Sequence, residues 1–183
     1  MSSDFNAQIK KLLKENRQEA ERLIYEHFIN KVYALILRSV GNPNVADDLS
    51  QEVFIKIFKK ISSFNWHSSL STWIYTITVN TVRDYFRRQK TYRKFLSSWL
   101  KKSKVVETQT PEKSMFKNYT ENMLNQAIQK LPDSLKEIVL LYYVTNLSIK
   151  EIAKVLGMKD STVKSRLKTA RQKLFEMLKD KLN

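Results

Sequence analysis

Turn-forming residues are so scarce in this chain that long helices are its natural secondary structure. Only 2 glycines and 3 prolines occur in 183 residues. A sheet needs tight turns between neighbouring strands, and glycine and proline supply the backbone angles for such turns. Hydrophobic residues also recur at three- and four-residue steps along much of the sequence, which is the spacing of a buried helix face. The sequence therefore predicts an all-α fold.

Composition also limits the chemistry that the chain can perform. There is no cysteine, and the only histidines are His27 and His67, too few for a thiolate or imidazole metal site. The sequence shows no nucleophile–base pair and no glycine-rich phosphate loop, so we expect neither an enzyme nor a cofactor. The first twenty residues lack the apolar core of a signal peptide, and the longest apolar runs are too short to cross a bilayer. We therefore expect a cytoplasmic protein without membrane insertion.

Charge is strongly positive and unevenly distributed. The chain holds 33 lysines and arginines against 18 acidic residues, a net charge of +15, which points to a polyanionic partner such as nucleic acid. Residues 41–54 hold three acids and no base, residues 83–104 hold nine bases and one acid, and residues 159–183 hold eight bases and three acids. Two separate basic segments would let the chain contact DNA at two places.

The helical pattern divides the chain into two units. Residues 1–102 and 120–183 carry helical periodicity, whereas residues 103–119 contain a proline and many polar residues without a clear period. We therefore predict two small helical domains, 1–102 and 120–183, joined by a flexible linker.

Helix boundaries in the first unit follow from its few turn residues. Apolar residues from Leu12 to Ile36 predict one helix, which the sequence Gly41-Asn42-Pro43 ends. Asn44 is then expected to cap the next helix. Residues 72–82 are ambiguous because their alternation of large and small residues half supports a strand. We predict a helix there, since no turn residues are available for a partner strand.

Residues 148–171 have the pattern of a helix-turn-helix. Ser148 and Glu151 form a capping box, and Gly157 permits the turn that follows the first helix. Asp160 or Ser161 is expected to cap the second helix. The face of this helix that lies opposite the buried Val163 holds hydroxyls, an amide and cations but no carboxylate, so it suits base edges and phosphates in a major groove. The predicted face and its flanks comprise Ser161, Ser165, Lys168, Thr169, Gln172, Lys164, Arg166 and Arg171.

A second candidate surface combines aromatic side chains with cations. Phe64 and Trp66 lie beside a polar loop, residues 62–69, where their burial is uncertain from sequence. Aromatic rings next to cations can stack single-stranded bases while the cations follow the phosphate backbone. Most of the other aromatic residues in this unit are expected to belong to the core.

Motifs from both units together resemble one protein family, the extracytoplasmic-function sigma factors of the sigma-70 type. The motifs that resemble its region 2 are NVADDLSQEVF at residues 44–54, SLSTWIY at residues 69–75, and Asn80. The motifs that resemble its region 4 are LPD at residues 131–133, SIKEIAKVLG at residues 148–157, and STVKSRL at residues 161–167.

The resemblance implies a set of partners and contact residues. The expected partners are core RNA polymerase, through the clamp helices of its largest subunit and through its flap, together with promoter DNA as duplex and as single non-template strand, and an anti-sigma factor. Polymerase binding is expected at Asp47, Asp48, Gln51 and Glu52. Contact with the −10 element, including capture of a flipped base, is expected at Phe64, Asn65, Trp66, His67, Ser68, Trp73, Asn80, Arg83, Asp84, Arg87 and Arg88. Contact with the −35 element is expected at Ser161, Thr162, Lys164, Ser165, Arg166, Lys168, Thr169 and Arg171.

Two other functions remain open from the residues alone. A two-domain helix-turn-helix regulator that works without core polymerase would share the C-terminal pattern. A recombinase or transposase subunit would also bind DNA, but it would need a carboxylate cluster or a nucleophile in a pocket, and acids at one helix start are poor evidence for that. Thr169 stands where the family often has arginine, so the −35 contact is expected to be weaker or differently specific.

Overall fold

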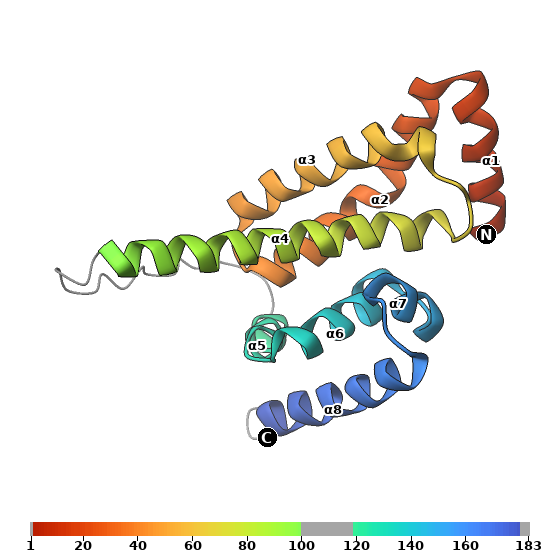
Figure 1. The fold of residues 1–183 in the computed structure, drawn as a ribbon. Coiled ribbons are helices and arrows are strands. Elements are labelled where there is room, and N and C mark those ends of the chain that lie inside the picture. Colours follow the sequence, from red (N-terminus) through yellow and green to blue (C-terminus); the bar gives the residue numbers. More distant parts are fainter. Residues whose placement is uncertain (1, 100–118, 180–183) are drawn as a thin grey trace.

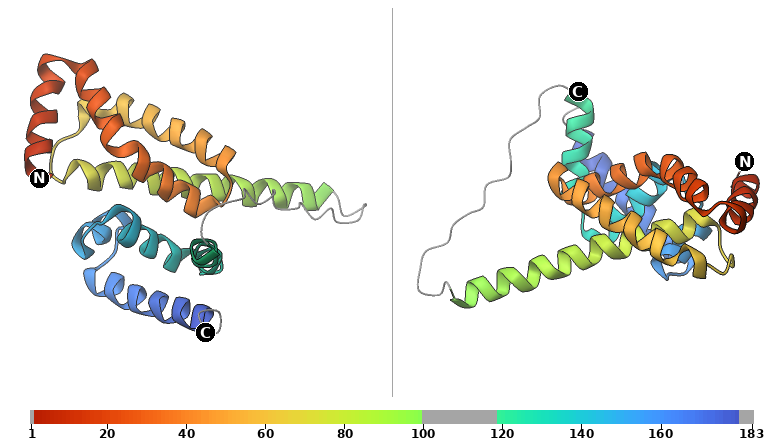
Figure 2. Two further views of the ribbon diagram at one scale, coloured as in Figure 1. Left: turned by 180° about the vertical axis from the view of Figure 1, so that it is seen from behind. Right: turned by 90° about the horizontal axis from the view of Figure 1, so that it is seen from above.

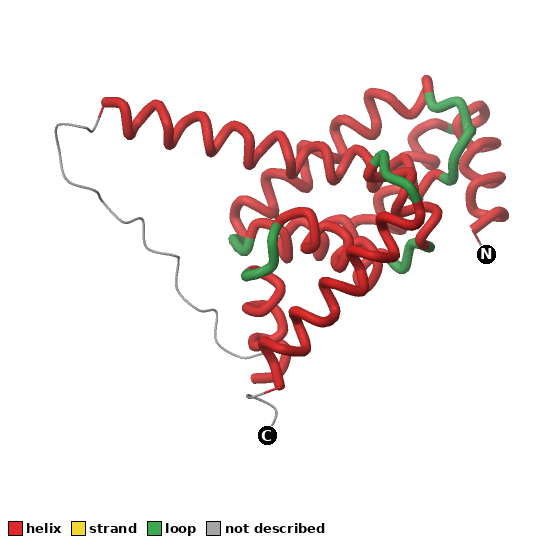
Figure 3. The backbone as a smooth tube through the Cα atoms, turned by 60° about the horizontal axis from the view of Figure 1, so that its bottom comes forward, coloured by secondary structure: helices red, strands yellow, loops and turns green. Residues whose placement is uncertain are grey.

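The protein is an assembly of helices in the computed structural model, which describes residues 2–99 and 119–179. Within these ranges there is no strand, and short loops join the helices (Figure 3). None of the described helices has the length and hydropathy needed to cross a bilayer. The elements are α1 (Ser2–Glu15), α2 (Arg17–Val40), α3 (Pro43–Lys60), a 3₁₀ turn (Ile61–Ser63), α4 (Leu70–Trp99), α5 (Tyr119–Gln129), α6 (Asp133–Thr145), α7 (Ile149–Leu156) and α8 (Asp160–Leu178).

The first helical stretch is broken at Asn16, so the prediction of one continuous helix from Leu12 to Ile36 was wrong. The side-chain oxygen of Asn16 accepts a hydrogen bond from the backbone N–H of Glu19 at 3.1 Å, and Asn16 thereby caps a new helix. The break lets α1 fold back against α2, where Ile9 is fully buried. A hydrophobic period continues across such a break because both helices bury the same kind of face.

The junction between α2 and α3 uses all three turn residues. Gly41 ends α2 in the left-handed region at φ 73°, and its N–H donates to the carbonyl of Leu37 at 2.8 Å. Asn42 then caps α3 by accepting from the N–H of Val45 at 3.2 Å, with Pro43 as the first helical residue. The cap is therefore Asn42, not Asn44 as predicted, because a proline at the first helical position needs no N–H partner.

Residues 72–82 are helical, as predicted, and belong to the long helix α4. Its threonines, which favour a strand by propensity, return their hydroxyl hydrogen bonds to the preceding turn. Thr76 donates to the carbonyl of Thr72 at 2.8 Å, and Thr78 donates to that of Ile74 at 2.9 Å. The later part of α4 projects beyond the other helices (Figure 2).

The C-terminal unit contains the predicted helix-turn-helix, formed by α7 and α8. The capping box is present, since Ser148 accepts from the N–H of Glu151 and the Glu151 carboxylate accepts from the N–H of Ser148 at 2.9 Å. Gly157 ends α7 at φ 65°. The predicted cap of α8 was wrong: Lys159 occupies that position without a side-chain hydrogen bond, and Asp160 is already helical. Pro132 likewise lies just before α6 rather than inside its first turn.

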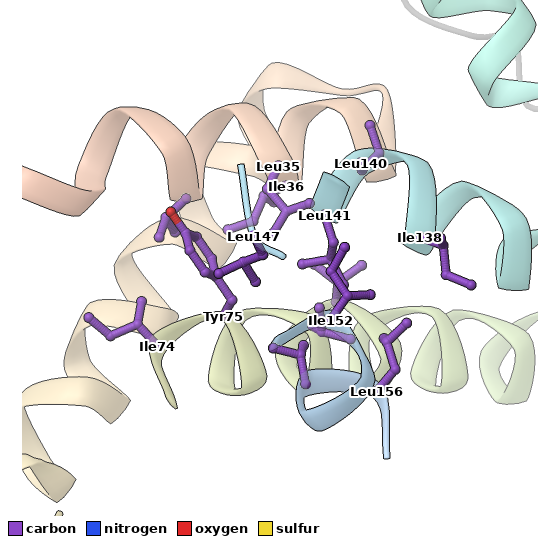
Figure 4. Close-up of a cluster of buried hydrophobic side chains, with 14 of the residues drawn as sticks. Leu35, Ile36, Ile74, Tyr75, Ile138, Leu140, Leu141, Leu147, Ile152 and Leu156 are labelled. Atoms are coloured by element: carbon purple, nitrogen blue, oxygen red, sulfur yellow. The ribbon is translucent and has the colours of Figure 1, made fainter. Parts of the chain in front are cut away.

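The two units share one hydrophobic core. Helix α4 lies between α2 and α3 on one side and the C-terminal helices on the other (Figure 1), with α6 packed on α2 and α7 packed on α4. The expected linker, residues 103–119, lies almost wholly outside the described residues. The core residues that gather between α2 and α4 include Leu35, Ile36, Ile74, Tyr75, Ile138, Leu140, Leu141, Leu147, Ile152 and Leu156 (Figure 4).

Candidate nucleic-acid interface

The predicted acidic surface lies on the first half of α3. Asp47, Asp48 and Gln51 are exposed, because the opposite face of the helix carries the buried Leu49, Val53 and Ile57. Beside this surface, α3 and α4 enclose an open groove of about 350 Å³. Its lining combines carboxylates with aromatic and basic groups, namely Val45, Asp48, Leu49, Glu52, Tyr85, Arg88, Gln89 and Tyr92.

Glu52 differs from the other three predicted residues because it is already paired within the protein. Its carboxylate accepts from Lys56 at 2.6 Å and from Arg88 of α4 at 3.4 Å. The hydrogen bond from Lys56, with the added charge of Arg88, holds the pKa of Glu52 below its usual value. A lowered pKa means that the pair is formed at neutral pH and is lost as the pH falls through that value. Glu52 therefore ties α3 to α4 and forms one wall of the groove.

The aromatic loop before α4 is partly folded into the core. Phe64 is only 8 % exposed, and its ring stacks on that of Trp73 with centroids 4.9 Å apart. Trp66 packs against the other side of this pair, 4.8 Å from Phe64. Phe64 is therefore a buried support, which sequence alone left undecided, while Trp66 and Trp73 are half-buried. Of the polar loop residues, Asn65 and His67 are exposed and Ser68 is half-buried.

Trp66 has an uncommon backbone conformation. Its φ of 61° lies in the left-handed region, which costs a residue with a Cβ atom about 1–2 kcal/mol. The loop retains this conformation while the ring packs on Phe64 and the side-chain oxygen of Asn65 accepts from the N–H of His67 at 3.2 Å. Lys10 of α1 places its ammonium 5.9 Å from the centroid of the Trp66 ring. The loop thus presents an indole with a cation beside it.

The basic residues of α4 are only partly free. Asn80, Arg87 and Arg88 are exposed, and Arg87 pairs with Asp84 one turn earlier at 2.9 Å. Arg83 instead reaches α6, where its Nε and Nη2 donate to the two oxygens of Glu137 at 2.8 and 2.7 Å. These hydrogen bonds raise the pKa of the Arg83 guanidinium. In this structure Arg83 is therefore occupied by the chain's own C-terminal unit.

The predicted recognition face of α8 is largely solvent-accessible. Ser161, Lys164, Ser165, Lys168 and Thr169 are exposed. They are held outward because the opposite face buries Val163, Leu167, Ala170 and Leu174. Thr162 is half-buried.

Two arginines at the edges of this face have partners within the protein. Arg166 packs on the turn, with its Nη1 3.6 Å from the sulfur of Met158. Arg171 donates to the hydroxyl of Tyr143 at 2.8 Å and lies over the ring of Tyr142. The remaining cations of the face, Lys164 and Lys168, are the ones that project into solvent.

Sequence reasoning missed two residues that the structure places at these surfaces. Lys10 lies 56 positions before Trp66, and Glu137 lies 54 positions after Arg83. Neither residue belongs to a motif, and each sits on a helix where a polar residue on the solvent side would be expected anyway. A contact between distant segments leaves no local signal in a single sequence.

Comparison with known proteins identifies both units. Residues 24–92 match the family model for sigma-70 region 2, and residues 121–174 match the model for sigma-70 region 4. The chain is 31% identical over 178 residues to the ECF RNA polymerase sigma factor SigW of Bacillus subtilis (strain 168), which covers 93% of this chain and 95% of SigW. It is 30% identical over 164 residues to the ECF RNA polymerase sigma-E factor of Escherichia coli (strain K12), covering 85% of this chain and 84% of that protein.

Solved structures share the fold at lower identity. CnrH in complex with the cytosolic domain of CnrY superposes with a TM-score of 0.70 at 20% identity, over 96% of this chain and 98% of that one. The sigma factor RpoE of Bartonella quintana, in complex with the anti-sigma factor NepR, gives a TM-score of 0.67 at 23% identity, over 86% of this chain and 96% of that one. Two matched regions in the right order, with near full-length similarity to SigW, mean that the chain belongs to the extracytoplasmic-function sigma factors of the sigma-70 family.

Proposed function

We propose that this sigma factor directs transcription initiation through three surfaces, each with its own partner. The acidic surface of α3 binds the clamp helices of core RNA polymerase. The loop around Trp66 and the basic face of α4 bind the −10 element, and the exposed face of α8 binds the −35 element. The observation that carries this assignment is the loop, where half-buried indoles lie beside Lys10 and at the start of a helix with an exposed cationic face.

The loop has the features that a single-stranded base requires. The rings of Phe64, Trp66 and Trp73 form a continuous stack, on which an unpaired base can lie with its face against an aromatic ring. Asn65 and His67 are exposed beside it and offer hydrogen-bonding groups for a base edge. Extruding a base costs a few kcal/mol, which such stacking and polar contacts can offset.

Promoter-dependent transcription by a reconstituted holoenzyme tests the proposal. Core polymerase supplemented with this chain is expected to start RNA at defined genomic sites, whereas core alone is not. A two-domain regulator that acts without core polymerase would bind duplex DNA but would not co-purify with core at low salt. A chain that neither binds core nor starts RNA at any site would exclude the sigma activity proposed for these surfaces.

Reversing the charge of Asp48 is expected to weaken binding to core polymerase. Asp48 is exposed on α3 beside the groove, and opposite charges across an interface favour encounter and register. We expect Asp48→Lys to lower core affinity about tenfold, with a smaller effect at high salt. Glu26→Lys is the matched control, because Glu26 is an exposed acid on α2, outside this surface. Equal core affinity for the two variants in a titration would contradict the assignment of α3.

Removing Lys164 is expected to weaken −35 duplex binding without changing its sequence preference. Lys164 is exposed on the recognition face, and a lysine ammonium is a point charge suited to a phosphate. We expect Lys164→Ala in the holoenzyme to reduce the slope of log affinity against log salt by about one. Lys179 is exposed past the end of α8, so Lys179→Ala should leave the slope unchanged. An unchanged slope in both variants would remove Lys164 from the contact surface.

An inhibitory protein partner also belongs to this proposal. Both solved relatives are described as complexes, CnrH with the cytosolic domain of CnrY and RpoE with the anti-sigma factor NepR. We expect this chain to be held inactive by an anti-sigma factor of its own, and co-purification of the tagged chain from its host tests this expectation.

A further inference from the structure

The surface assigned to the −10 element is covered in part by the chain's own C-terminal unit. Arg83 of α4 donates two hydrogen bonds to Glu137 of α6. At the start of the same helix, the Ser69 hydroxyl lies 3.4 Å from the carboxylate of Glu151 on α7. The side-chain amide of Gln129 on α5 also donates to the carbonyl of Arg38 on α2. These polar contacts connect the two units at three separated points.

Apolar packing accompanies these contacts. Helix α6 lies on α2 and α7 lies on α4, and Leu141 of α6 and Ile152 of α7 are fully buried between them (Figure 4). Burial of such side chains favours association, at roughly 25 cal/mol for each Å² of apolar surface removed from water. The arrangement is therefore a packed interface and not a polar contact alone.

Glu137 offers Arg83 the same geometry that a DNA phosphate would offer. A carboxylate and a phosphate each present two oxygens that accept the parallel N–H groups of a guanidinium. The pair is partly buried, with 39% of the Arg83 side chain and 23% of the Glu137 side chain exposed. While the pair is formed, Arg83 has both of these donors engaged, so it cannot bind a phosphate in the same way.

We propose that the free chain has a closed, self-inhibited conformation in which the C-terminal unit docks on α4 and Glu137 takes the place of a promoter phosphate at Arg83. This inference rests on the proposed −10 function of α4. In the closed conformation the Arg83–Glu137 pair acts as a latch, and DNA competes with the latch for the same guanidinium. Separation of the two units exposes the −10 surface.

Promoter dimensions require the same separation. The −10 and −35 elements are about 25 base pairs apart, which is about 85 Å along B-DNA at 3.4 Å per pair. A compact chain of 183 residues has a radius of gyration of about 16 Å. A conformation in which α7 packs on α4 therefore cannot place α8 on one element and the loop around Trp66 on the other. The closed form must open before both elements are bound.

Glu137→Ala in the full-length chain tests the latch without polymerase. We expect this variant to bind fluorescent, random-sequence single-stranded DNA about fivefold more tightly than the unmodified chain, because Arg83 is released. Glu137→Gln keeps the shape of the side chain, loses its charge, and should show the same direction. Glu26→Ala is the charge-matched control, because it removes an exposed acid of α2 that pairs only with Arg22 among the contacts seen here.

A distance measurement reports the closed conformation directly. The chain has no cysteine, so Lys11→Cys on α1 and Lys173→Cys on α8 give two specific dye sites, both exposed. Energy transfer between the dyes should fall when Glu137→Ala is added and should not fall when Glu26→Ala is added. Equal transfer and equal DNA affinity in the two variants would overturn the latch. This readout needs neither polymerase nor promoter, so a failure of transcription in the reconstituted system would count against the proposed function and not against the closed conformation.

Discussion

Trp66→Ala is expected to reduce the fraction of open promoter complex about 5- to 150-fold while leaving core polymerase binding unchanged. The substitution removes the indole on which an unpaired base would stack, and such stacking contributes about 1–3 kcal/mol per base. Trp66 lies in a loop separate from the acidic surface of α3, so the docking of core is not affected. Permanganate reactivity of thymines in the non-template strand measures the opening.

Two further variants separate the role of the ring from that of the backbone. Trp66→Phe keeps an aromatic face and should retain most of the opening. Trp66→Gly removes the ring and also relieves the left-handed backbone at φ 61°. It should therefore lose opening as Trp66→Ala does, although its loop is less strained. Normal permanganate reactivity in Trp66→Ala would mean that strand capture occurs elsewhere on the protein.

Leu141→Ala is expected to lower the free energy of unfolding by about 2–5 kcal/mol. Leu141 is fully buried on α6 within the core shared by the two units, so its truncation removes apolar contacts and leaves a cavity. A loss of this size is a large fraction of the stability of a protein of this length. Urea denaturation followed by circular dichroism measures the change.

Leu124→Ala provides the matched control, because Leu124 is 42% exposed on α5. The same chemical change there should cost less than about 1 kcal/mol, since little apolar surface returns to water. If Leu141→Ala unfolded at the same urea concentration as Leu124→Ala, the core between α2, α4 and α6 would not be formed in solution. Ile152→Ala, in the same core on α7, should behave like Leu141→Ala.

The latch places a limit on how the protein is activated. Arg83 has one partner in the closed structure and is proposed to have another in the promoter complex. Any partner that separates α6 from α2, core polymerase included, therefore also prepares the −10 surface. Binding of the chain to polymerase and its exposure to DNA would in this way be coupled through one interface, with a coupling free energy that is shared between the two ligands.

The sequence by itself determined the features that act over three or four residues. The capping box of Ser148 and Glu151, the turn at Gly157 and the buried stripe of α8 are local, because hydrogen bonds of caps and the helical repeat join residues close in the chain. The helical state of residues 72–82 was also predictable, because the chain has so few turn residues. The cap at Asn42 was misplaced by two positions, since several polar residues near a proline can serve as a cap.

Only the tertiary structure decided what lies opposite each side chain. The burial of Phe64, the position of Lys10 beside Trp66, and the pairing of Arg83 with Glu137 each join segments that the sequence does not relate to one another. Polar and aromatic residues at these positions are compatible with several surroundings, and their choice depends on how whole helices pack. The sequence thus established which groups are available for DNA and polymerase, while packing established which of them the closed protein keeps occupied.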